Sequence, residues 1–183
     1  MRAALLFNSQ PEVLSRYQRH YLHLNIDEFQ DTNIAQYEMV KQIGGKYHNI
    51  CVVGDPDQSI YSWRSADLRN ILNFEKDYPD ARVILLEQNY RSTKTILEAA
   101  QHVISSNQQR KEKSLWTENE VGTPLTISET YSEQEEAQFV INEVDRLMEQ
   151  NIASPGDCAV MYRTNAQSRA IEEAFIRYGI PYK

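Results

Sequence analysis

The chain has 183 residues, of which 41% are hydrophobic and 25% are charged, and its formal net charge is −7 at pH 7. This composition suits a globular protein that buries a core, and it excludes an intrinsically disordered chain. Because the net charge is negative, a surface that is basic throughout is also excluded, and any nucleic-acid site must be local.

Neither a membrane span nor a disulfide is expected. No apolar run approaches the roughly 18 residues of a membrane span, and the first residues lack the long apolar region of a secretory signal. We therefore expect a soluble, cytoplasmic protein with no membrane partner. Cys51 and Cys158 lie in apolar runs without CxxC spacing, which predicts reduced core cysteines without a zinc site.

Short apolar runs alternate with helical segments in the first half of the chain. The runs at 21–26, 49–53 and 82–86 are predicted strands. Apolar stripes between them predict one helix from Ile34 to Gly44 and another over 68–72. This alternation predicts parallel β-α-β units whose helices cover the sheet.

A second lobe is predicted to begin after the third strand. Its elements, in chain order, are a helix over 96–104, a solvated loop with the basic cluster 110–113, a strand at 124–127, a helix opened by a capping box of Ser132 and Glu135, a strand at 158–162, and a last helix that stops at Gly179.

Two adjacent carboxylates, Asp27 and Glu28, follow the first predicted strand. Open α/β sheets bind ligands at the carboxyl ends of their strands. A P-loop ATPase needs one carboxylate there for Mg²⁺, and often a second one to orient the attacking water. The pair fits these two roles, although the ordinary alternative is a solvated strand end or helix start.

A second group of chemical residues follows the predicted strand at 49–53. Gln58 is a candidate sensor of a γ-phosphate, because an amide contacts phosphate without adding charge. Tyr61, Trp63 and Arg64 interleave aromatic and basic side chains, as stacking on single-stranded bases requires. The ordinary alternative for the two aromatic residues is packing in the core.

Four segments together resemble the motifs of one helicase family. DEFQDTN at 27–33, VGDPDQSIYSWR at 53–64, LEQNYRST at 86–93 and YRTNAQSR at 162–169 look like motifs II, III, IV and IVa of superfamily 1A DNA helicases. The sequences of these motifs are most similar to those of the UvrD/Rep/PcrA family, and within it to the PcrA branch. Four motifs in the right order and spacing are far more specific than any one alone.

The resemblance implies an α/β fold, namely the three-layer αβα fold of RecA-like P-loop NTPases, with parts of two lobes. Residues 1–20 would be the tail of the first-lobe (1B-like) insertion, 21–85 the second half of lobe 1A, and 86–183 the first part of lobe 2A. The implied activity is ATP-dependent 3′ to 5′ movement on DNA and duplex unwinding, in repair or replication. ATP and Mg²⁺ are the implied cofactors, and the implied partners are single-stranded DNA, duplex junctions and accessory repair or replication proteins.

The family's residue roles carry over onto matching positions. Asp27 would hold Mg²⁺, and Glu28 would activate the water. Gln58 would contact the γ-phosphate, Tyr90 would stack on the nucleotide base, and Arg91 would be the arginine finger. The residues implied to line the path of single-stranded DNA are Tyr61, Trp63, Arg64, Arg163 and Asn165.

One family feature is absent from the chain. No GxxxxGK[ST] phosphate-binding loop occurs, so we expect a middle fragment of a helicase that hydrolyses ATP poorly or not at all by itself. Two other classes stay open: a truncated, non-catalytic protein that binds single-stranded DNA or a partner, and part of a helicase-nuclease of the AddA or RecB kind.

Four of the implied residues also have ordinary structural alternatives. Tyr90 could pack between lobes, and Arg91 could be a surface arginine. Arg163 and Asn165 could cap the last helix.

Overall fold

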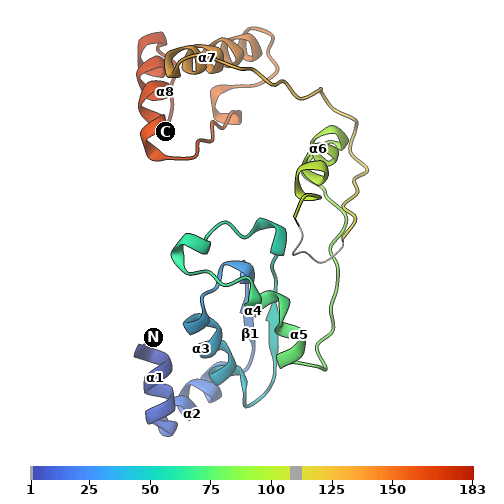
Figure 1. Ribbon diagram of the computed structural model, residues 1–183, viewed down its shortest axis with the longest axis vertical. Coiled ribbons are helices and arrows are strands. Elements are labelled where there is room, and N and C mark those ends of the chain that lie inside the picture. The colour runs from blue at the N-terminus through green and yellow to red at the C-terminus, as the bar shows by residue number, and fades with distance from the viewer. Residues whose placement is uncertain (1, 108–112) are drawn as a thin grey trace. The chain divides into compact units, whose positions relative to one another are not determined.

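The computed structural model describes residues 2–107 and 113–183. Its contacts divide the chain into two compact units, Met1–Leu125 and Thr126–Lys183. The helices and strands of the first unit are α1 (Arg2–Ser9), α2 (Pro11–His20), β1 (Leu24–Ile26), α3 (Ile34–Gly44), β2 (Ile50–Val52), α4 (Arg69–Leu72), α5 (Phe74–Asp77) and α6 (Lys94–Ile104) (Figure 1). The second unit contains α7 (Glu133–Glu149) and α8 (Asn165–Tyr178).

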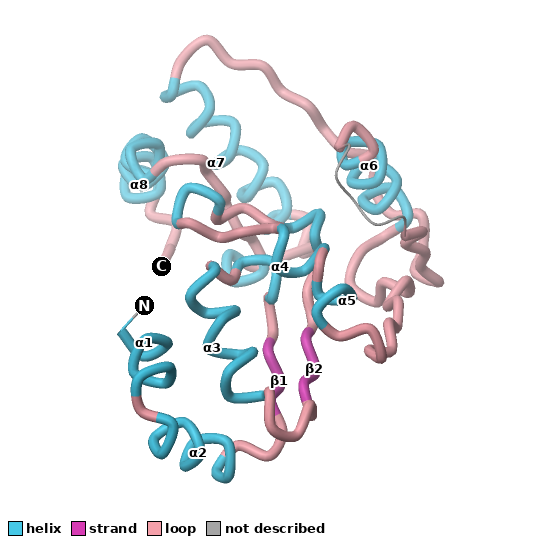
Figure 2. The backbone as a smooth tube through the Cα atoms, turned by 60° about the horizontal axis from the view of Figure 1, so that its bottom comes forward, coloured by secondary structure: helices cyan, strands magenta, loops and turns pink. Residues whose placement is uncertain are grey.

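The strands β1 and β2 form a two-stranded parallel sheet joined by α3, as the alternating pattern predicts. Leu24 pairs with Ile50, and Ile26 pairs with Val52. The pairing continues for one further residue, because the N–H of Val53 donates to the carbonyl of Ile26 at 2.8 Å. Figure 2 shows α3 running beside the two strands. Both strands therefore end at the same edge of the sheet.

Local capping determines where α3 begins. The side chain of Asn33 accepts a hydrogen bond from the N–H of Gln36 at 2.9 Å, and the Gln36 side chain accepts one from the N–H of Asn33 at 2.9 Å. This reciprocal pair satisfies two N–H groups that have no partner within the helix. The helix ends at Gly44, as predicted.

The first two helices pack against α3 through polar contacts. Nε2 of Gln42 donates to Oδ1 of Asn8 in α1 at 2.8 Å, and Nε2 of Gln18 in α2 donates to the carbonyl of Gln42 at 2.9 Å. The side chains of Ala4 and Phe7 are buried at this junction. Residues 2–20 thus form a helical pair against the outer side of α3.

The predicted strands at 82–86, 124–127 and 158–162 are wrong. These segments form no strand in the structure, because a strand requires a neighbouring backbone to complete its ladder, and no segment of the described chain pairs with them. Residues 82–86 are exposed throughout. Cys51 is exposed as well, so the prediction that it lies in the core is also wrong.

The second unit has a core of its own between α7 and α8. Ile141 is fully buried, and Phe175 packs in the same cluster. Oγ of Ser132 accepts a hydrogen bond from the N–H of Glu135 and caps α7, as predicted, but the Glu135 carboxylate reaches the N–H of Tyr131 instead of Ser132. As predicted, α8 stops at Gly179, which has φ of +69°.

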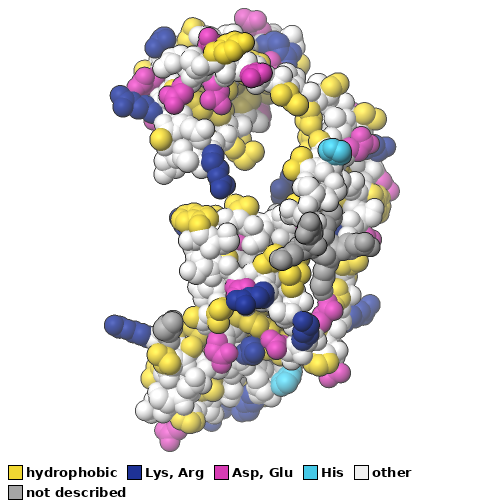
Figure 3. All heavy atoms as spheres, in the orientation of Figure 1, with side chains coloured by type: hydrophobic (Ala, Val, Ile, Leu, Met, Phe, Trp, Pro, Cys, Tyr) yellow, Lys and Arg dark blue, Asp and Glu magenta, His cyan; other side chains and the backbone are white. Residues whose placement is uncertain are grey.

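Many large hydrophobic side chains lie at the surface of both units, where they alternate with charged groups in the space-filling view (Figure 3). No helix in the described part of the chain is both long and apolar enough to cross a membrane.

Candidate nucleotide and nucleic-acid site

The predicted catalytic pair lies where β1 ends. Asp27 and Glu28 are both exposed, and Oδ1 of Asp27 accepts a hydrogen bond from the N–H of Glu28 at 2.9 Å. Glu28 adopts the left-handed backbone conformation, with φ of 49° and ψ of 43°. A non-glycine residue persists in this conformation only where its surroundings hold it, and such positions cluster at functional sites.

The residue after Glu28 anchors the turn in the core. The side chain of Phe29 is fully buried, and its ring meets the rings of Tyr37 and Phe74 edge to face, with centroids 5.4 Å and 5.6 Å apart. Its N–H donates to the carbonyl of Val53 at 2.9 Å. The turn that carries Glu28 is therefore held by the packing of the Phe29 ring and by a backbone hydrogen bond to the residue that follows β2.

Gln30 joins this turn to the segment after β2. Its side chain is 1% exposed; Nε2 donates to Oε2 of Glu28 at 2.7 Å, and Oε1 accepts from the N–H of Asp55 at 3.0 Å. Our sequence reasoning missed Gln30. The only sequence feature that points to Gln30 is weak. It is an amide side chain next to an apolar aromatic residue, and an amide can bond to a donor and to an acceptor at once.

The second predicted segment forms what we call the sensor loop, residues 54–58. Gln58 lies at its end, exposed, and Nε2 of Gln58 donates to Oδ2 of Asp55 at 2.8 Å. The loop passes close to Gln30, because a Cβ atom on Gly54 would lie 2.6 Å from Oε1 of Gln30. The structure thus links Glu28 to Gln58 through Gln30 and Asp55.

Lys113 also contacts the sensor loop. Its ammonium group forms ion pairs with Asp55 and with Asp57, the latter at 3.2 Å, and its side chain is 18% exposed. Burial would raise the pKa of Asp55, but hydrogen bonds from Lys113, Gln58 and the N–H of Asp57 outweigh burial and hold that pKa below its ordinary value. The predicted solvated loop is therefore wrong at Lys113, and the rest of the cluster, 110–112, lies outside the described residues.

The predicted base-stacking residues lie on an exposed turn. Trp63 is 69% exposed and Tyr61 is 37% exposed, so neither is a core residue. The guanidinium carbon of Arg64 lies 4.4 Å from the centroid of the Trp63 ring and 5.5 Å from that of Tyr61. A cation beside two accessible aromatic faces can hold a phosphate while a base stacks on a ring.

The motif IV residues lie on a loop whose backbone is held by two asparagines. Oδ1 of Asn89 accepts from the N–H of Arg91 at 3.0 Å, and Nδ2 of Asn119 donates to the carbonyl of Tyr90 at 3.3 Å. Both predicted side chains are exposed. Within the described ranges, no hydrogen bond or ion pair joins either side chain to Asp27, Glu28 or Gln58.

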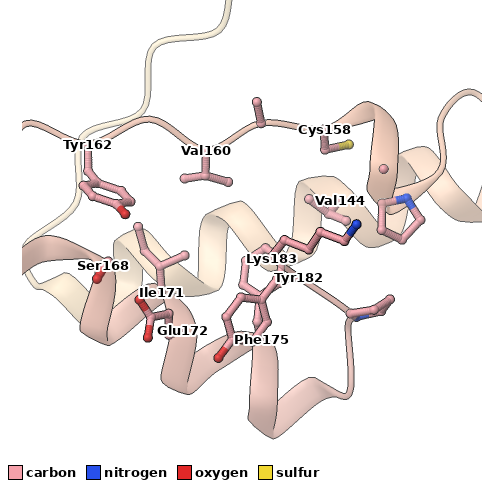
Figure 4. A pocket seen from close by; sticks show the side chains of 14 residues that line it. Val144, Cys158, Val160, Tyr162, Ser168, Ile171, Glu172, Phe175, Tyr182 and Lys183 are labelled. Carbon is pink, nitrogen blue, oxygen red and sulfur yellow. The ribbon is translucent and has the colours of Figure 1, made fainter. Parts of the chain in front are cut away.

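Arg163 and Asn165 belong to the second unit and are exposed at the start of α8. The reciprocal cap of this helix is formed by Thr164 and Gln167, so Arg163 and Asn165 do not cap it with their side chains. A cavity of about 810 Å³ also lies in this unit, with Val160, Ile171 and Phe175 among its lining (Figure 4). The cavity is mainly apolar, and none of the predicted ATP or DNA residues lines it.

The carboxylates at the sheet edge provide only part of the ligands that an Mg²⁺ ion needs. The part of the chain that the structure describes contains no group of three or more His, Cys, Asp or Glu side chains that could hold a metal. Mg²⁺, however, typically binds through one or two carboxylates and takes its other ligands from water and substrate phosphates. Asp27, an exposed carboxylate at the sheet edge, fits that kind of site.

Comparison with known proteins gives matches along almost the whole chain. Residues 1–79 match the model of the UvrD/REP helicase N-terminal domain, and residues 84–183 match that of the UvrD-like helicase C-terminal domain. The chain is 54% identical to the ATP-dependent DNA helicase PcrA of Staphylococcus aureus over 177 residues, and this aligned region covers 97% of this chain and 24% of that protein. It is 53% identical over 182 residues to the ATP-dependent DNA helicase PcrA of Bacillus subtilis, which covers 100% of this chain and 25% of that protein. The chain therefore spans about a quarter of the length of these relatives.

Proposed function

The chain belongs to the UvrD-like helicase family, and from this premise we propose that it forms part of the ATP- and DNA-binding core of a 3′ to 5′ DNA helicase. The observation that carries the proposal is the convergence of two motifs at one sheet edge. Glu28 follows β1 and Gln58 follows β2, and hydrogen bonds through Gln30 and Asp55 connect them. In the proposed fold, each family domain contributes part of a RecA-like three-layer lobe.

The proposed chemistry is hydrolysis of ATP by in-line attack of water on the γ-phosphate. Glu28 orients that water, Gln58 contacts the γ-phosphate, Tyr90 stacks on the base, and Arg91 neutralises charge as the phosphate is transferred. Asp27 holds Mg²⁺, which when bound supplies further charge neutralisation at the phosphates.

The proposed DNA contact is the exposed turn of Tyr61, Trp63 and Arg64. A single strand would stack its bases on the aromatic rings while the guanidinium group contacts a phosphate. Because the sensor loop precedes this turn by only a few residues, loss of phosphate contact at Gln58 would reach the DNA contact through a short stretch of backbone. Arg163 and Asn165 are proposed to contribute a second part of the DNA path, and accessory repair or replication proteins are proposed partners.

DNA binding can be tested on this chain as it stands, by fluorescence anisotropy of a labelled oligodeoxythymidine strand. Trp63→Ala should weaken binding by about 1–3 kcal/mol, which is about 5- to 150-fold, because it removes one stacking platform. Trp116→Ala is the matched control, since Trp116 is also an exposed tryptophan of the first unit. Equal losses in the two variants, or none in either, would refute the assignment of Trp63.

The proposed ATP hydrolysis is tested in a helicase of the relatives' full length that carries these 183 residues. There, Glu28→Gln should abolish turnover while ATP still binds, because the amide cannot take a proton from the water. Turnover close to that of the unmodified protein would overturn the role proposed for Glu28.

A further inference from the structure

The side chain of Gln30 is buried and is hydrogen-bonded on both ends. Its Nε2 donates to the Glu28 carboxylate at 2.7 Å, and its Oε1 accepts from the backbone N–H of Asp55 at 3.0 Å. A hydroxyl on Ser59 adds a longer bond of 3.4 Å to the Gln30 carbonyl. The bond to Asp55 crosses 25 residues of sequence, and together these bonds connect the segment after β1 to the segment after β2.

The two partners allow only one orientation of the amide. The carboxylate of Glu28 accepts hydrogen bonds but cannot donate, and the N–H of Asp55 donates but cannot accept. A flipped amide would set oxygen against oxygen and N–H against N–H, with no water at hand because Gln30 is 1% exposed. The amide therefore transmits a defined geometry from one loop to the other.

We propose that Gln30 is a positioning residue that holds the carboxylate of Glu28 in register with the sensor loop. This inference rests on the proposed function, in which Glu28 orients water and Gln58 contacts phosphate. When the sensor loop moves, the N–H of Asp55 moves with it, and Gln30 passes that shift to Glu28. The orientation of the attacking water is thus tied to occupancy of the phosphate contact.

Two substitutions separate the two bonds of Gln30. Gln30→Glu keeps an oxygen that can accept from the N–H of Asp55, but it loses the donor to Glu28 and places two carboxylates together. Gln30→Met has a similar volume and loses both bonds. The matched control is Gln42→Met, because Gln42 is a partly buried glutamine of the same unit that donates to Asn8 and to the carbonyl of Ala4.

The first measurement is amide hydrogen exchange in this chain, read at the N–H of Asp55 relative to that of Tyr37 in α3. Gln30→Met should speed exchange at Asp55 at least about 10-fold, whereas Gln30→Glu and Gln42→Met should leave it within about 3-fold. The exchange rate at Asp55 is divided by the exchange rate at Tyr37 in the same protein. A general loss of stability raises both rates and therefore cancels from the ratio. Unchanged exchange in Gln30→Met would overturn the link to the sensor loop.

The second measurement is steady-state kinetics in a helicase of the relatives' length that carries this chain. Both Gln30 substitutions should lower kcat by about 10- to 100-fold and change KM for ATP by less than about 3-fold, because they misplace the water-orienting carboxylate. A rise in KM without a fall in kcat would refute a role in positioning Glu28.

A double-substitution comparison distinguishes positioning from a general structural effect. In single-turnover measurements, Gln30→Met should have little additional effect in a Glu28→Ala background, since the group that it positions is gone. The same fold-loss in both backgrounds would show a merely structural role. If Glu28→Ala itself left turnover unchanged, the proposed function would fail; if only Gln30→Met did, the positioning inference alone would fail.

Discussion

Replacing Phe29 with alanine should destabilise the first unit and leave the stability of the second unit unchanged. Phe29 is fully buried and packs edge to face against Tyr37 and Phe74. Phe→Ala in a core costs about 3–5 kcal/mol, and small domains are stable by only about 5–15 kcal/mol. With a urea dependence of about 2 kcal/mol per molar, the unfolding midpoint of this unit should fall by about 2 M.

The two units can be followed separately, because the chain has two tryptophans and both belong to the first unit. Tryptophan fluorescence therefore reports the first unit, whereas far-ultraviolet circular dichroism reports the helices of both. Ile141→Ala is the matched substitution in the α7–α8 core. It should cost about 2–5 kcal/mol and should shift the circular dichroism transition without moving the fluorescence transition.

Two outcomes would refute this reasoning. A shift of the fluorescence midpoint by less than about 0.5 M in Phe29→Ala would show that the aromatic cluster does not hold the first unit together. If fluorescence and circular dichroism moved together in both variants, the chain would unfold as one cooperative body, and its division into two units would have no energetic meaning.

Three further predictions use urea unfolding, followed by tryptophan fluorescence for the first unit and by circular dichroism for the second. Lys113→Met should lower the free energy of unfolding by about 1.5–3 kcal/mol at neutral pH. Burial by itself would raise the pKa of Asp55, but hydrogen bonds that include the one from Lys113 hold that pKa below its ordinary value. The stability difference between the two proteins should therefore be complete above about pH 4 and should shrink as pH falls through the lowered pKa. A stability difference that stays constant with pH would contradict this prediction. Glu28→Gly should be more stable than Glu28→Ala by about 1 kcal/mol, because only glycine adopts φ of 49° without strain, and the reverse order would contradict the left-handed assignment. Gly179→Ala should destabilise the second unit by about 1 kcal/mol through backbone strain alone, since an added Cβ would meet nothing within 4 Å; a stable variant would show that the end of α8 relaxes freely.

Helix ends and the first β-α-β unit could be predicted because their causes are local. The start of α3 follows from Asn33 and Gln36, and the end of α8 follows from Gly179. The strand expected at 82–86 could not be judged in this way. Its apolar residues fit a buried strand, but a strand exists only when another segment supplies the other half of the ladder.

Sequence patterns are enough to show which chemical groups follow each of the two strands, and to which helicase family the chain belongs. Only the tertiary structure showed that Gln30 connects Glu28 to the sensor loop, and that Lys113 pairs with Asp55 across 58 residues of sequence. Local patterns carry information about neighbours within a few residues, because propensity and capping act over one or two helical turns. A buried hydrogen bond between distant segments depends on how the chain packs, and here that packing gives a glutamine between two motifs its role.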